Sequence, residues 1–124
     1  MSASLQSVST APALGSDTAI EELTGLSTRP YFRPPYGDYD ASVNADLYAR
    51  GYTYNVLWTV DSLGWDGLPA ADITRRCLDR AEPGAIFVFH VGSASQDAAA
   101  LQPIIDGLRG TGYSMTKISD LLAP

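Results

Sequence analysis

A chain of 124 residues, 45% hydrophobic and 18% charged, is long enough for one domain with a modest core. Its net charge of −6 argues against a nucleic-acid or anionic-membrane partner, because both bind through basic patches. No apolar run is long enough for a membrane span, and the first residues lack the basic and apolar regions of a signal peptide. The single cysteine, Cys77, excludes an internal disulfide, and we expect a buried thiol rather than a nucleophile.

The first half of the chain is expected to alternate helices and strands after an irregular start. Residues 1–16 are rich in Ser and Ala and predict a disordered or poorly packed lead-in, which leaves 17–124 as the domain. The predicted elements are a helix from Ser16 or Asp17 to Leu26, a strand running into a loop over 31–37, a helix over 42–50 capped by Ser42, and a strand over 52–60.

The second half continues the alternation. Residues 85–91 form an almost continuous apolar run, which is typical of a strand buried on both faces of a parallel sheet. The predicted elements are a loop over 61–69, a helix over 70–81, the strand over 85–91, a helix over 96–109, a strand over 113–118 and a short helix from Ser119. This β-α-β-α-β-α-β order predicts an α/β fold with parallel strands, either an open sheet or part of a barrel.

Side chains capable of chemistry follow three of the predicted strands. Arg33 and Tyr36 lie in the loop after the first strand, Asp61 ends the second, and His90, the only histidine, lies near the end of the third. Trp65 follows Asp61 in the same loop. Because the carboxyl ends of parallel strands share one face, we expect these side chains to gather there.

Each of these residues also has a simpler explanation. Arg33 could belong to a Pro-rich surface turn, and His90 could be an ordinary residue at the rim of the core. Asp61 could simply begin a turn, and Trp65 could serve packing alone. Their coincidence at neighbouring strand ends favours a site. A histidine beside a carboxylate suits a general acid, an arginine suits fixing a carboxylate, and a backbone N–H near Tyr36 could face an oxyanion.

Three segments carry a family resemblance: Phe32-Arg33-Pro34-Pro35-Tyr36-Gly37, Trp58-Thr59-Val60-Asp61-Ser62-Leu63-Gly64-Trp65 and Ile86-Phe87-Val88-Phe89-His90. In order and spacing they resemble the last three motifs of NodB-type polysaccharide deacetylases, and the similarity covers about residues 17–122. The resemblance implies the C-terminal part of a distorted (β/α) barrel. It also implies hydrolysis of N-acetyl groups in N-acetylglucosamine glycans, of chitin or peptidoglycan type, with a divalent metal such as zinc.

The resemblance also implies residue roles. His90 is the general acid that protonates the leaving amine, Arg33 orients the aspartate base, and Tyr36 offers its backbone N–H to the oxyanion. Trp65 and Val88 line the acetyl pocket. Many members have an aspartate directly before the tryptophan, where this chain has Gly64, so Asp61 is expected to contribute to tuning His90 or to loop structure.

The family's Asp-Asp pair and His-x-x-x-His motif are both absent from this sequence. No metal site is therefore expected from this chain alone, and little activity without a complementing polypeptide. The alternatives are a non-catalytic module that binds a glycan or a protein, and a truncated product without a settled function. Unpaired strand edges of a partial barrel predict a homo-oligomer or a complementing chain.

Overall fold

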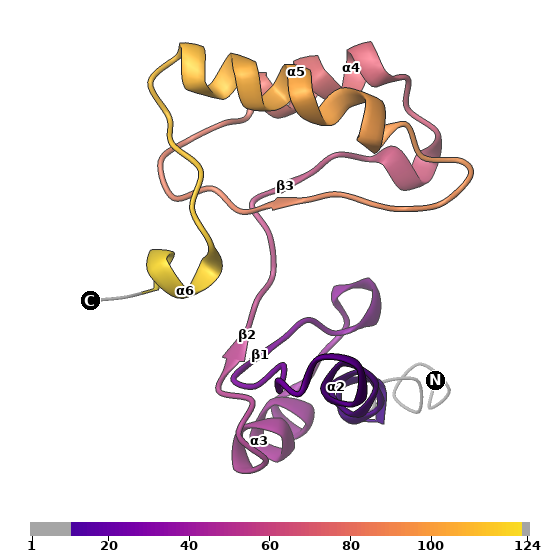
Figure 1. Cartoon of the computed structure of the whole chain (residues 1–124), viewed down its shortest axis with the longest axis vertical. Coiled ribbons are helices and arrows are strands. Elements are labelled where there is room, and N and C mark those ends of the chain that lie inside the picture. The colour runs from indigo at the N-terminus through magenta and orange to yellow at the C-terminus, as the bar shows by residue number, and fades with distance from the viewer. Residues whose placement is uncertain (1–10, 123–124) are drawn as a thin grey trace. The chain divides into compact units, whose positions relative to one another are not determined.

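The structure is a computed structural model that describes residues 11–122, which form two compact units divided between Leu57 and Trp58 (Figure 1). The first ten residues of the predicted lead-in lie outside the described part. None of the described helices has both the length and the apolar character needed to cross a membrane.

The first unit is built from two helices and a parallel pair of short strands. Its elements are α2 (Ala11–Thr24), β1 (Tyr31–Phe32), the 3-10 turn η1 (Pro35–Gly37), α3 (Ala41–Ala49) and β2 (Tyr54–Asn55). Tyr31 of β1 lies opposite Tyr54 of β2, and their rings stack with centroids 5.7 Å apart. The core consists of Val43, Leu47 and Tyr52, with Leu14 and Phe32 packed against it.

Both helix starts predicted in this unit were wrong. Helix α2 begins at Ala11 rather than at Ser16 or Asp17, and it ends at Thr24 rather than at Leu26. Helix α3 is capped by Asp40, whose extended backbone lets its carboxylate accept the Val43 N–H at 2.8 Å, and not by Ser42.

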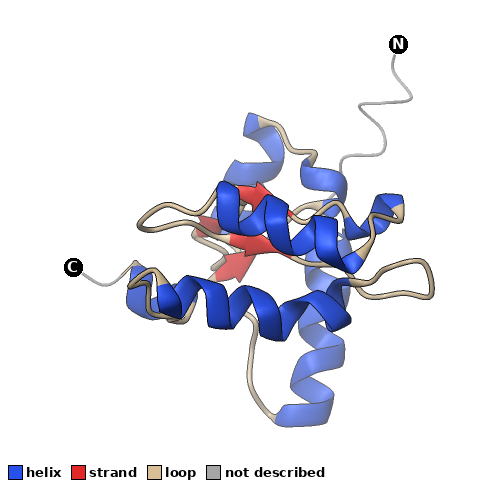
Figure 2. Cartoon of the chain, turned by 90° about the horizontal axis from the view of Figure 1, so that it is seen from above, coloured by secondary structure: helices blue, strands red, loops and turns tan. Residues whose placement is uncertain are grey.

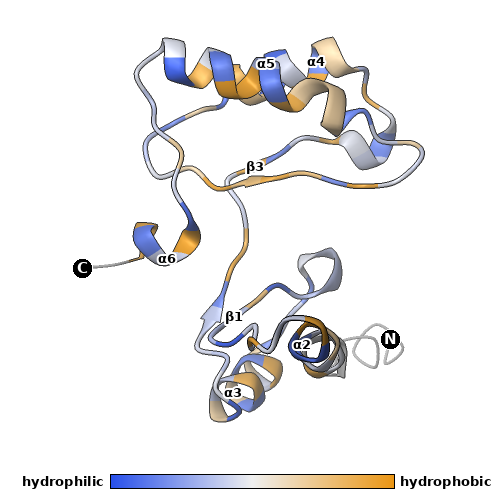
Figure 3. Cartoon of the chain, viewed as in Figure 1, coloured by the Kyte–Doolittle hydropathy of each residue, from blue (hydrophilic) through white to orange (hydrophobic). Residues whose placement is uncertain are grey.

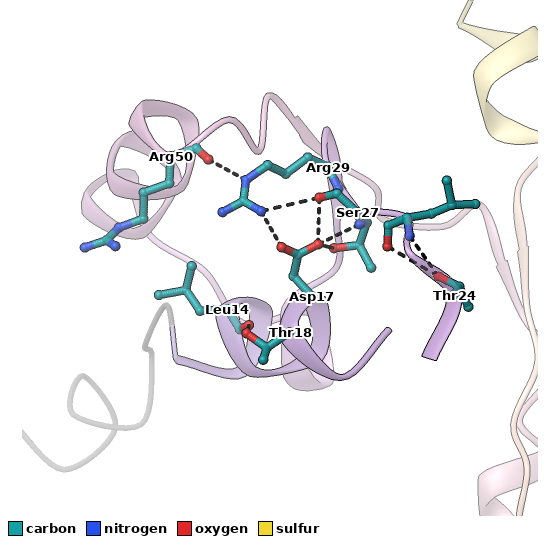
Figure 4. A network of polar contacts seen from close by, with 9 residues as sticks. Leu14, Asp17, Thr18, Thr24, Ser27, Arg29 and Arg50 are labelled. Carbon is teal, nitrogen blue, oxygen red and sulfur yellow. Dashed lines mark hydrogen bonds and ion pairs between the residues drawn. The ribbon is translucent and has the colours of Figure 1, made fainter. Parts of the chain in front are cut away.

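Asp17 lies within α2 at the centre of a polar cluster (Figure 4). Its carboxylate, 5% exposed, accepts hydrogen bonds from the Ser27 hydroxyl at 2.7 Å and the Thr28 backbone N–H at 2.6 Å, and it forms an ion pair with Arg29. These hydrogen bonds hold the pKa of Asp17 well below its usual range. Arg29 Nε also donates to the Arg50 carbonyl at 2.7 Å. The cluster therefore ties α2 to the end of α3.

The second unit packs two helices against another parallel pair of strands (Figures 1 and 2). Its elements are β3 (Val60–Asp61), η2 (Gly64–Asp66), α4 (Ala70–Asp79), β4 (Phe87–Val88), α5 (Asp97–Gly110) and α6 (Ile118–Leu121). The core is made by β3, α4 and α5: Val60, Ile73, Cys77, Ala100, Ile104 and Leu108. Figure 3 shows hydrophobic and hydrophilic bands alternating along α5, as its sequence periodicity predicts.

Burial of Cys77 is confirmed. The side chain is fully buried in this core, and burial raises the pKa of its thiol to about 11. A protonated, inaccessible thiol is a poor nucleophile, so Cys77 packs as a small apolar residue.

The expected α/β fold with parallel strands is confirmed, but several strands are shorter than predicted. The single strand expected over 52–60 is divided into β2 and β3, which belong to different units, and 85–91 reduces to β4. The strand predicted over 113–118 was wrong: no described strand pairs with residues 113–117, and helix α6 begins at Ile118 rather than at Ser119. Helix α4 ends at Asp79 rather than at Ala81.

Candidate functional site

His90 and Asp61 meet at the carboxyl ends of β3 and β4. Asp61 is the last residue of β3 and lies opposite Val88, and His90 comes two residues after Val88. His90 Nε2 is 2.8 Å from Asp61 Oδ1, and both side chains are partly buried. The expectation that parallel strand ends bring these two side chains together is confirmed.

Three donors converge on the Asp61 carboxylate. They are the Leu63 N–H at 2.9 Å, His90 Nε2, and Trp65 Nε1 at 3.2 Å. Burial raises the pKa of Asp61, but these hydrogen bonds lower it by more, so the pKa of Asp61 lies below its ordinary value. Asp61 is therefore ionised at neutral pH. Because an ionised carboxylate can only accept hydrogen bonds, His90 Nε2 must carry the proton in this contact.

The loop after Asp61 is shaped by local hydrogen bonds. Leu63 has φ 63, the left-handed region, and its N–H is held by the Asp61 carboxylate two residues earlier. The Ser62 hydroxyl in turn accepts the Gly64 N–H at 3.1 Å. A non-glycine residue in this conformation is strained and persists where its surroundings fix it. Asp61 thus opens a turn, which was one of its predicted explanations, and its side chain also contacts His90. That Asp61 tunes His90 stays a prediction.

Trp65 follows this turn, and Val88 lies across from it on β4. The Trp65 side chain is 59% exposed, while its indole N–H is fixed on Asp61 Oδ2. Val88 is buried opposite Asp61 in the strand pair, and its carbonyl accepts the Ser62 N–H at 3.1 Å. The role of Trp65 and Val88 in an acetyl pocket stays a prediction.

Asp97 is the residue that sequence reasoning missed. It is 3% exposed, and its Oδ2 accepts the His90 backbone N–H at 2.6 Å and the Ser62 hydroxyl at 2.8 Å. The signal in the sequence is faint: an acidic residue at the start of a helix, seven positions after His90. Such residues usually serve the helix alone.

Arg33 and Tyr36 lie in the first unit. Arg33 Nε donates to the Val56 carbonyl at 2.9 Å and so holds the backbone after β2. Tyr36 is 97% exposed in η1 with φ 56, again a left-handed non-glycine residue. That Arg33 and Tyr36 join the residues of the second unit in one site stays a prediction.

The described residues do not fit a catalytic divalent metal. Within residues 11–122 no group of three or more His, Cys, Asp or Glu side chains is placed to hold a metal ion. The sole histidine contacts Asp61 through Nε2, whereas a catalytic zinc needs about three protein ligands.

No family model matches the chain, but curated and solved proteins do. It is 33% identical to a bifunctional xylanase/xylan deacetylase of Cellvibrio japonicus, over 70% of this chain and 13% of that protein. It is 31% identical to the peptidoglycan-N-acetylmuramic acid deacetylase PdaA of Bacillus subtilis, over 83% of this chain and 40% of that protein. A CE4 family pseudoenzyme from Bacillus anthracis matches with a TM-score of 0.78 at 27% identity, covering 89% of this chain and 38% of that one.

The chain spans less than half the length of these three proteins. It carries the three motif segments, and two of them meet in the contact between His90 and Asp61. The chain is therefore homologous, over most of its 124 residues, to part of the CE4, NodB-type polysaccharide deacetylases.

Proposed function

We propose that the chain is the part of a polysaccharide deacetylase that carries the general acid, and that the substrates are N-acetylglucosamine glycans. We propose further that the chain is inactive alone. The contact between His90 and Asp61 carries the proposal, because it places a histidine on an ionised carboxylate at the strand ends. Homologues include peptidoglycan and chitooligosaccharide deacetylases, which supports the substrate class. In this proposal the two parallel strand pairs are the C-terminal part of a distorted (β/α) barrel.

The chemistry assigned to His90 is proton delivery. When an acetamide is hydrolysed, the C–N bond breaks and the leaving nitrogen must take up a proton. Because His90 Nε2–H stays on Asp61, the doubly protonated ring would give its Nδ1 proton to the leaving nitrogen and would be left neutral, with its remaining proton on Nε2. Arg33 would orient the aspartate base, and the Tyr36 backbone N–H would stabilise the oxyanion.

The base and the metal would have to come from outside the described residues. CE4 deacetylases are metalloenzymes, and a metal supplies Lewis-acid and water-activating chemistry when bound. A positioned acid alone contributes only about 10²–10⁴-fold. Turnover therefore requires a second polypeptide or further strands.

A non-catalytic module that binds a glycan or a protein is the second candidate. It is favoured by Trp65, whose exposed indole can stack on a sugar ring, next to a site where no three side chains of the metal-binding types gather among residues 11–122. A homologue described as a CE4 family pseudoenzyme shows that this family includes inactive members.

Association with another chain is part of the proposal. Residues 17–124 would form the deacetylase-related domain, and the proposed lead-in 1–16 overlaps it in structure, because residues 11–16 already belong to helix α2. In the described part of the chain each ladder has two strands, which leaves outer edges open to a homo-oligomer or a complementing chain. Light scattering of the purified chain should report a dimer or larger species, and a monodisperse monomer would contradict this.

Acetate release from N-acetylglucosamine oligomers, with zinc added and His90→Ala as the control, tests the function. The proposal predicts no release from the folded chain alone. Zinc-dependent release that is lost in His90→Ala would show that this chain or its oligomer supplies the metal ligands and the base. The proposal that the chain is inactive alone would then be wrong. Release that persists in His90→Ala would remove His90 from the chemistry.

A further inference from the structure

The carboxylate of Asp97 joins two loops that come from different strands. Its Oδ2 accepts the Ser62 hydroxyl from the loop after β3 and the His90 backbone N–H from the segment after β4. The Ser95 hydroxyl reinforces the junction, because it donates to the His90 carbonyl at 3.0 Å and accepts the Asp97 N–H at 3.1 Å. The backbone of His90 is thus held on both sides by residues at the start of α5.

The other oxygen of Asp97 lies against Gly64. Oδ1 is buried and has no hydrogen-bond partner among the described residues. A Cβ atom at position 64 would come within 2.6 Å of the Asp97 Cγ, closer than real Cβ atoms approach. Gly64 is not among the residues with positive φ, so glycine is needed there for space and not for backbone conformation.

We propose that Asp97 is a positioning residue for His90: its carboxylate joins the two loops, holds the His90 ring on Asp61, and requires glycine at position 64. An aspartate that served only its own helix would bond to the first N–H groups of α5, whereas the bonds accepted by Asp97 Oδ2 come from β3 and β4 loops.

The functional importance of this positioning rests on the proposed function of His90. The test of the positioning measures the geometry around His90 and not enzymatic activity. The chain has one histidine, so its ring resonances are unambiguous in a nitrogen-15 spectrum. In Asp97→Asn, which keeps the side-chain shape, we expect the His90 amide proton to move upfield and the ring resonances to move toward those of Asp61→Asn. Asp106→Asn, an exposed change on the same helix, should leave both unchanged.

The proposal would be overturned if the His90 amide and ring resonances in Asp97→Asn were the same as those in the unmodified chain. If the variant does not fold, the unmodified chain provides the test. A scalar coupling through the hydrogen bond, from the His90 backbone nitrogen to the Asp97 carboxyl carbon, should be detected. Its absence from a well-resolved spectrum of the folded chain would overturn the proposal equally.

The requirement for glycine is tested by a pair of substitutions. Gly64→Ala should lower the Tm by at least about 4 °C, because its Cβ displaces the Asp97 carboxylate. Adding Asp97→Ala removes the obstruction, so the double variant should lose less than the sum of the two single losses. Gly110→Ala on α5, where a Cβ meets open space, is the matched control. Strictly additive losses would contradict the proposed contact.

Discussion

Asp61 and His90 are 29 residues apart in sequence, and their side chains meet at 2.8 Å because β3 and β4 run parallel in register. Each strand is only two residues long, so the contact depends on a few backbone hydrogen bonds, on the helices that cover β3, and on the turn that begins at Asp61. The candidate site is thus built from short elements fixed by polar contacts.

Asp61 should stabilise the fold in a pH-dependent way. Its folded pKa lies below its unfolded value of about 3.9, so its contribution is complete above that value and is lost as pH falls through the folded pKa. The Tm difference between the unmodified chain and Asp61→Asn should therefore be larger at pH 7 than at pH 2.5. A difference that is independent of pH would contradict the lowered pKa.

Trp65 should contribute to glycan binding and little to stability. Its side chain is 59% exposed, so Trp65→Ala should change the free energy of unfolding by no more than about 1 kcal/mol. Calorimetric titration with N-acetylglucosamine oligomers should show binding in the unmodified chain and loss of at least tenfold in Trp65→Ala. Tyr48→Ala, an exposed aromatic on α3, is the control. Equal affinity of Trp65→Ala and the unmodified chain would exclude Trp65 from the sugar contact.

Asp17 should be important for the stability of the first unit. Asp17→Ala removes the acceptor of Ser27 and Thr28 and the ionic partner of Arg29. We expect a clearly larger fall in Tm than for Asp46→Ala, which removes only an exposed pair with Arg50 on α3. Similar falls for both variants would show that the cluster has no special contribution.

Cys77 should be unreactive in the folded chain. Its thiol is fully buried, and burial raises its pKa to about 11. A thiol reagent at pH 7.5 should modify it only in denaturant, where the thiol is exposed and its pKa returns to about 8.5. Rapid modification under native conditions would show that the core around α4 and α5 opens readily.

The positions of His90 and Asp61 at strand ends could be predicted from the sequence, because an apolar run indicates a buried strand without reference to the rest of the chain. Residues 85–91 end close to His90, and residues 52–60 end next to Asp61. Strand lengths could not be predicted in the same way, because a strand needs a partner. Residues 113–117 have strand-like composition but no paired neighbour in the described chain.

Asp17 and Asp97 show where sequence patterns fail. Asp17 was predicted only as a possible helix start and Asp97 was not singled out at all, yet each binds groups that a local pattern does not reveal. Asp17 binds residues 27–29, ten or more positions away, and Asp97 binds Ser62, 35 positions away. Contacts of this kind depend on how loops return to one another, which carries no periodic signal.

The most direct test of the central claim is the nitrogen-15 spectrum of the His90 ring in the purified chain and in Asp61→Asn, with Asp66→Asn as a control. A carboxylate that accepts from Nε2 should slow exchange of that proton with water. The account predicts a visible Nε2 proton in the unmodified chain and in Asp66→Asn, and its loss in Asp61→Asn. Identical ring spectra in Asp61→Asn and in the unmodified, folded chain would show that His90 and Asp61 do not pair.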